Sequence, residues 1–133
     1  MKSLLPVRIL FYVSAAYDGL LGLAFLLAGP QLYQWVGITP PNHWGYVHFA
    51  AAVLVLFGYM FLRVALHPLV ERNLILFGIQ LKICYVGTVA WHWAHDGLPM
   101  LWKYFAVADV GFALLFCWSV VFLDSVAKKP AAS

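Results

Sequence analysis

The sequence predicts an all-α membrane protein in which residues 1–133 form a single membrane domain, an integral four-helix up-and-down bundle with an N-in/C-in orientation. Hydrophobic residues make up 65% of the chain and charged residues only 10%, whereas soluble domains average about 45–50% and about 25%. Four continuous apolar windows occur, near residues 7–29, 44–66, 72–94 and 100–123. So few polar groups cannot coat a water-soluble core, which excludes a soluble enzyme, a disordered linker and a collagen-like fibre.

Each window has about 23 residues, hence roughly 34 Å of helix, which is enough to cross the hydrocarbon core of a bilayer. Backbone groups in lipid must be hydrogen-bonded within their own segment, so continuous apolar runs predict helices. The first window follows Lys2 and includes Arg8, as a signal peptide would. Its apolar run exceeds the usual h-region of about 7–15 residues, which predicts a retained helix.

Helix-breaking residues separate the windows. In chain order they are Gly29-Pro30, Thr39-Pro40-Pro41-Asn42, His67-Pro68 with Glu71-Arg72-Asn73, and Asp96-Gly97 with Pro99. Gly29-Pro30 is expected to end the first helix, and Asn42 to cap the second. Because the last two connections are short, consecutive helices are expected to pack antiparallel as an array of hairpins.

Basic residues predict the orientation of the bundle. With four spans, both termini and the second connection lie on one face, and that face holds six of the eight Lys and Arg residues. These six are Lys2, Arg8, Arg63, Arg72, Lys128 and Lys129. Lys103 lies on the opposite face, and Lys82 lies within a span. The positive-inside rule therefore places both termini in the cytoplasm. So thin a basic rim predicts no nucleic-acid partner.

Three charged residues, Asp18, Lys82 and Asp109, lie far from any loop. A charge at mid-membrane depth costs about 2.5–3.5 kcal/mol on insertion scales. One lysine placed between two carboxylates reduces that cost, so the sequence predicts that the three side chains meet inside the bundle. Two interpretations stay open: a structural ion pair that fixes helix register, or a binding or proton-responsive site.

Each of the three charges belongs to a helical face that is expected to point into the bundle. Residues at three- and four-residue steps on the third window share one helical face: Lys82, Tyr85, Val89, His92 and Asp96. The first window has a narrow face of small residues: Ser14, Ala15, Asp18 and Gly22. The fourth window offers an aromatic lining around its carboxylate: Trp102, Phe105, Asp109, Phe112 and Phe116. Tyr85 therefore joins the intramembrane polar site.

Four of the five histidines fall on the outward side, among most of the tryptophans. They are His43, His48, His92 and His95. His92, His95 and the adjacent Asp96 suit a transition metal such as zinc, copper or iron, and His48 with His92 suits a b-type haem. Interfacial histidines without a ligand are the simpler interpretation, and the three alternatives stay open. Cys84 and Cys117 form no CxxC pair and are expected to be buried thiols.

Four short stretches carry a family resemblance. They are Asp18-Gly-Leu-Leu-Gly, Phe57-Gly58, LKICYVG at 81–87 and ADVGFALLF at 108–116. Over residues 5–123 the chain resembles the DoxX-like families of small bacterial membrane proteins. The resemblance implies a four-helix bundle in the bacterial inner (plasma) membrane. Some DoxX-type proteins are associated with quinone-linked sulfur oxidation or oxidative-stress complexes, but no cysteine pair or cofactor motif carries a redox role over to this chain.

Three functions follow as hypotheses. The first is a non-enzymatic accessory or hydrophobic-ligand-binding protein with a buried Asp-Lys-Asp site. The second is a membrane redox component that binds haem, metal or quinone near the outward histidines and tryptophans. The third is a small proton-coupled transporter, for which four spans would require a homodimer. Expected partners are the lipid bilayer and either further copies of the chain or a larger membrane complex. No GxSxG, phosphate-loop or HExxH motif indicates an enzyme, and no catalytic residue is assigned.

Overall fold

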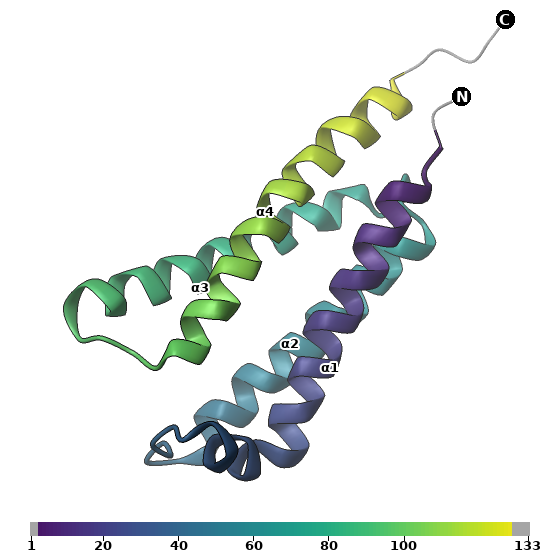
Figure 1. Cartoon of the computed structure of the whole chain (residues 1–133). Coiled ribbons are helices and arrows are strands. Elements are labelled where there is room, and N and C mark those ends of the chain that lie inside the picture. Colours follow the sequence, from purple (N-terminus) through teal and green to yellow (C-terminus); the bar gives the residue numbers. More distant parts are fainter. Residues whose placement is uncertain (1–2, 129–133) are drawn as a thin grey trace, which may run out of the picture.

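A computed structural model describes residues 3–128. Over these residues it contains no strand and four α-helices, which confirms the all-α fold class (Figure 1). The helices are α1 (Leu5–Val36), α2 (Trp44–Leu66), α3 (Ile75–His95) and α4 (Met100–Ala127), and a short 3-10 helix, η1 (Arg72–Leu74), precedes α3. All four, with η1 added to α3, are long and apolar enough to cross a membrane.

The expected end of the first helix at Gly29-Pro30 is wrong, because α1 continues to Val36. The helix kinks instead, with Ala28 at φ −137° and ψ 29°. After the kink Pro30 lies in the first turn of the continuing segment, where a missing N–H breaks no helical hydrogen bond. Gly37 then ends the helix in the left-handed region at φ 69°, which favours glycine.

The remaining helix ends follow the sequence more closely. His43, rather than Asn42, caps α2: its Nδ1 accepts a hydrogen bond of 2.9 Å from the backbone N–H of Gly45. The ring nitrogen accepts a hydrogen bond from a free backbone N–H of the first turn, as the side-chain oxygen of an Asn cap would. As predicted, α2 ends just before His67-Pro68 and α4 begins directly after Pro99. The fourth helix runs four residues beyond its apolar window, to Ala127.

The helices form two antiparallel hairpins. Most inter-helix contacts lie within α1–α2 and α3–α4, and far fewer join α2 to α3 or α1 to α4. The expected packing of α2 along α3 is therefore wrong: after the turn at 67–71 the two helices diverge (Figure 1). The described chain ends lie at the same end of the molecule, as an even number of alternating helices requires.

Close approach of backbones holds the first hairpin together. A Cβ added to Gly58 would lie 2.7 Å from Gly19 Cα, and one added to Gly22 would lie 2.6 Å from the Ala51 carbonyl oxygen. Ser14, on the same face of α1, is also buried. Ala15 and Gly22 of the predicted small-residue face thus contact α2, together with Gly19, which the prediction did not include. Van der Waals packing stabilises this contact.

A single apolar core joins all four helices near the end that carries the termini. Its fully buried members are Val7, Phe11, Phe61, Val64, Ala65, Ile75, Phe116 and Leu123. The rings of Phe11 and Phe116 stack there with centroids 4.9 Å apart. At the other end a smaller cluster around Phe25, Tyr33 and Ala51 involves α1, α2 and α4. The hairpins are therefore joined at one end and separated toward the other.

Arginine side chains tie the elements at the joined end. Arg8 donates a 3.1 Å hydrogen bond to the Leu66 carbonyl, one of the last in α2, where a cation also opposes the helix dipole. Arg63 pairs with Glu71 across the turn, and Arg72 lies 3.5 Å from Asp124 on α4. Of the six basic residues assigned to this face, Lys2 and Lys129 lie outside the described residues.

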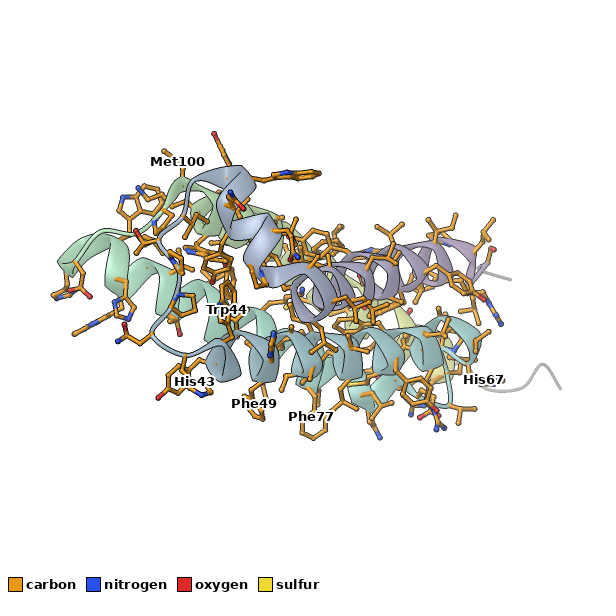
Figure 2. The ribbon with its side chains drawn as sticks, turned by 90° about the horizontal axis from the view of Figure 1, so that it is seen from below. His43, Trp44, Phe49, His67, Phe77 and Met100 are labelled. Carbon is orange, nitrogen blue, oxygen red and sulfur yellow. The ribbon has the colours of Figure 1, made fainter. Side chains whose placement is uncertain are left out.

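Large apolar side chains cover the outer faces of the helices. Trp35 is 86% exposed, and Phe49 and Phe77, 73% and 56% exposed, point away from their helices (Figure 2). The expectation of buried thiols is wrong, because Cys84 and Cys117 are both free and exposed. The outward face of a helix in lipid is as apolar as its inward face, so an apolar neighbourhood does not indicate burial.

Candidate functional site

Lys82 lies between two carboxylates inside the bundle, as the sequence predicts. Its Nζ is 2.9 Å and 3.0 Å from the two carboxylate oxygens of Asp18 and 3.0 Å from Oδ1 of Asp109. The three side chains come from α3, α1 and α4, so the contact joins the two hairpins. The side chains of Lys82 and Asp18 are each 1% exposed, and that of Asp109 is 9% exposed.

Aromatic rings surround the ammonium group on its remaining sides. The Lys82 Nζ lies 5.2 Å, 5.5 Å and 5.9 Å from the ring centroids of Phe112, Tyr17 and Phe61. The negative faces of such rings attract a cation, and the attraction strengthens where water is excluded. These contacts and the two carboxylates together offset the cost of burying the lysine.

The two carboxylates differ in how their oxygens are used. Both oxygens of Asp18 accept from Lys82, whereas the hydrogen bond of Asp109 uses Oδ1. A carboxylate has about four acceptor positions, and the Asp109 side chain is the more exposed of the two. Oδ2 of Asp109 therefore keeps the capacity to accept a hydrogen bond from another group.

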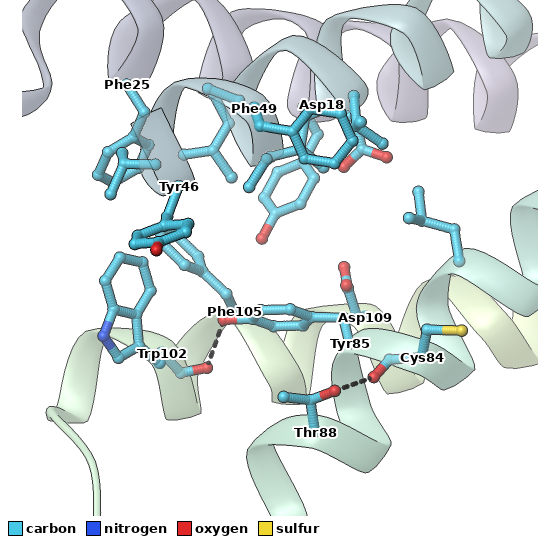
Figure 3. A pocket seen from close by; sticks show the side chains of 18 of the residues that line it. Asp18, Phe25, Tyr46, Phe49, Cys84, Tyr85, Thr88, Trp102, Phe105 and Asp109 are labelled. Carbon is cyan, nitrogen blue, oxygen red and sulfur yellow. Dashed lines mark hydrogen bonds between the residues drawn. The ribbon is translucent and has the colours of Figure 1, made fainter. Parts of the chain in front are cut away.

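A cavity of about 740 Å³ lies between the two hairpins and reaches both carboxylates (Figure 3). On the α1–α2 side Phe25 and Phe49 form its wall, and on the α3–α4 side Trp102 and Phe105 do so. All four helices contribute lining residues. Cavities of about 300–1,000 Å³ with apolar walls and a few polar groups are typical of small-molecule sites.

The polar groups of the third helix that line the cavity are already satisfied. Tyr85 Oη donates a 3.0 Å hydrogen bond to the Trp102 carbonyl, and Thr88 Oγ1 donates a 2.7 Å hydrogen bond to the Cys84 carbonyl (Figure 3). Tyr85 thus lines the predicted polar site, but its hydroxyl fastens α3 to α4 and makes no hydrogen bond with Lys82, Asp18 or Asp109.

Tyr17 is a site residue that the sequence analysis missed. It lines the cavity, and its Oη is buried without a hydrogen-bond partner among the described residues. Its ring packs edge-on against Phe105, with centroids 6.5 Å apart. The only sequence signal is its position beside Asp18, because a tyrosine in an apolar span is otherwise unremarkable. A buried polar group without a partner is costly, so the Tyr17 hydroxyl is available to a further hydrogen-bond partner, such as a water or a ligand.

The outward histidines do not assemble as a group. His92 Nδ1 lies 2.6 Å from Asp96 Oδ2, but His95 turns back along α3, with Nδ1 2.8 Å from the Trp91 carbonyl oxygen. His92, His95 and Asp96 therefore do not converge on one point, which does not favour the metal-site alternative, and within residues 3–128 no group of three His, Cys, Asp or Glu side chains is placed to hold a metal ion. His43 Nδ1 caps α2. The haem pairing of His48 with His92 stays a prediction.

Comparisons of the chain with protein-family models, with curated proteins and with solved structures give no match. The DoxX-like resemblance therefore stays a prediction.

Proposed function

We propose that this chain is an integral membrane protein that binds a hydrophobic molecule between its two helical hairpins, without enzymatic chemistry of its own. The observation that carries the proposal is the cavity, whose apolar walls end on Asp18 and Asp109. Such a site combines a large apolar surface for affinity with a few polar groups that orient the ligand.

The surroundings of the cavity support a location within the bilayer. Its lining residues come from the middle and outward parts of four helices that are each apolar enough to span a membrane. We propose that both termini face the cytoplasm, because Arg8, Arg63 and Arg72 gather at the end that carries the termini. The bacterial inner membrane is proposed on the DoxX-like resemblance alone.

A purely structural ion pair explains less of the site. Such a pair serves helix packing best when it is sealed, with each polar atom hydrogen-bonded. Here Asp109 borders a large cavity, and Oη of Tyr17, which lines the same cavity, has no partner among residues 3–128. These two features favour a site that receives a further molecule.

Two neighbouring alanines of α2 offer a matched test. Ala50 lines the cavity, whereas Ala52 does not, and both are exposed. Ala50→Trp would fill part of the cavity, and Ala52→Trp would add the same bulk on the lipid-facing side. We expect native mass spectra of the protein, purified in mild detergent, to show a bound apolar molecule in the wild type and in Ala52→Trp but not in Ala50→Trp.

Either of two results would contradict the proposal. One is a wild-type protein that carries no bound molecule after gentle extraction; the other is equal retention of the molecule by both tryptophan variants. In the second case the molecule would lie on the outer surface, as annular lipid does.

A further inference from the structure

We propose that the cavity selects an amphiphile with a cationic amine head, which binds against Asp109 and Tyr17 while its apolar tail lies along the aromatic walls. This inference deepens the proposed function and rests on it. It names the chemistry of the ligand head, which the size and apolarity of the cavity leave open.

The charge of the site favours a cation. When ionised, the two carboxylates and Lys82 together carry one excess negative charge. Within the described residues, the ion pairs of Asp18 and Asp109 both involve Lys82 alone. An excess charge in a low-dielectric interior is costly unless it is paired. A ligand ammonium would supply the missing positive charge, whereas a carboxylate head would add a second like charge.

The hydrogen-bonding groups favour a donor. Asp18 already uses both oxygens, and the one hydrogen bond of Asp109 uses Oδ1, which leaves Oδ2 as an acceptor. Tyr17, which lines the same cavity, has a hydroxyl oxygen without a hydrogen-bond partner among the described residues, and this oxygen is a second acceptor. An alkylammonium has three N–H donors and can serve both, while an alcohol has one. The expected order of affinity is therefore amine, then alcohol, then carboxylate.

The mouth of the cavity indicates how such a molecule enters. On α2 the lining residues Tyr46 and Phe49 are 76% and 73% exposed, and on α3 Cys84 and Thr88 are also exposed. The opening therefore lies on the side of the molecule, between α2 and α3, where the hairpins diverge. In a bilayer this side faces the acyl chains, so an amphiphile would enter laterally with its tail already in lipid.

The two native cysteines give a direct readout. Cys84 lines the cavity, whereas Cys117 on α4 does not, and both are exposed and free. Cys117→Ser leaves Cys84 as the reporter, and Cys84→Ser leaves Cys117 as its control. Each variant would be alkylated with N-ethylmaleimide in detergent, with dodecylamine, dodecanol or dodecanoate added as the probe.

We expect dodecylamine to protect Cys84 at a concentration about tenfold lower than dodecanol does, because charge-assisted hydrogen bonds are stronger than neutral ones by roughly 1.4 kcal/mol, a factor of ten. Dodecanoate should give the weakest protection. Cys117 should react at the same rate with and without each probe, since probe binding in the cavity does not cover it.

Variants of the head site test the assignment of residues. Asp109→Asn should abolish the tenfold preference for the amine, and Tyr17→Phe should reduce it. Asp124→Asn, which removes a carboxylate from the same helix but outside the cavity, should leave the preference intact and so exclude a general charge effect. If Asp109→Asn does not fold, Tyr17→Phe and the wild-type probe series still decide the question.

The outcomes separate the two proposals. Equal protection of Cys84 by all three probes, lost in Ala50→Trp, would overturn the amine assignment and leave the binding function standing. A preference for dodecanoate would likewise overturn the assignment. If Cys84 reacts normally with every probe present, both the amine assignment and the binding function are wrong.

Discussion

Burial of Lys82 imposes a desolvation penalty that its carboxylate partners and the surrounding rings offset. Its Nζ makes three hydrogen bonds, to both oxygens of Asp18 and to Oδ1 of Asp109, which satisfies every N–H of the ammonium. Removal of the cation alone would leave two carboxylates close together without a counter-charge. We therefore expect Lys82→Met to lower the free energy of unfolding by about 3–5 kcal/mol.

The measurement is reversible unfolding in mixed micelles, with Lys103→Met as the matched control. Lys103 lies outside the ion pairs, with its Nζ 4.5 Å from the ring centroid of Trp93, so its replacement should cost about 1 kcal/mol or less. A triple variant that also carries Asp18→Asn and Asp109→Asn should recover much of the loss, because no unpaired charge remains. Equal stability of both single variants would contradict this account of the site.

At the scale of helices, two features of α1 shape the cavity: its close contact with α2 and its kink. Its small residues bring α2 into backbone contact, and its kink at Ala28 redirects the segment that carries Tyr33. The Tyr33 ring lies 5.0 Å from Trp44 and 5.9 Å from Trp102, centroid to centroid, and Tyr33 and Trp102 both line the cavity. A helix that stopped at Gly29 would not carry this part of the lining.

Gly58→Ala tests the contact between α1 and α2. The new Cβ would lie 2.7–2.8 Å from backbone atoms of Gly19, so the helices must move apart, at a cost of about 1–3 kcal/mol. Gly111→Ala in α4 is the control, because nothing lies within 4 Å of its added Cβ. We expect a lower melting temperature in detergent for Gly58→Ala and an unchanged one for Gly111→Ala. The same melting temperature for both variants would refute the close packing.

At the scale of the whole molecule, two hairpins are joined at one end by an apolar core and by the ion pairs of Lys82 midway along the helices. Beyond the ion pairs the hairpins separate, and the cavity occupies the space between them. This arrangement gives the molecule a packed end with basic residues and, away from the termini, a part that is open on one side between the hairpins.

The orientation of the whole chain is testable with reporter fusions. The positive-inside rule predicts that green fluorescent protein fused after the described C-terminal residue Lys128 is fluorescent, whereas alkaline phosphatase at that position is inactive. Phosphatase fused after Gly97, at the opposite end of the bundle, should be active. The reverse pattern of activities would show that the termini face outward.

Much of the candidate site could be predicted because charges are rare in this chain. Asp18, Lys82 and Asp109 are the only Asp, Glu or Lys residues deep within the apolar windows, and the cost of an unpaired charge in lipid requires them to meet. Tyr17 could not be found in this way, because its importance depends on a hydroxyl that lacks a partner. The exposure of Cys84 could not be predicted either, because the local sequence does not show which apolar face of a helix points into the bundle.

The sequence by itself determined that four helices form, where three of them begin, and that their buried charges pair. Apolar length and the cost of unpaired polar groups act locally or between few residues, so they can be read along the chain. Tertiary structure alone decided that α2 and α3 diverge, that α1 kinks and continues, and that a cavity opens beside Asp109. These features depend on how apolar side chains of different shapes fit together. Because the helices are apolar on most of their faces, the hydrophobic pattern does not show which faces pack against each other.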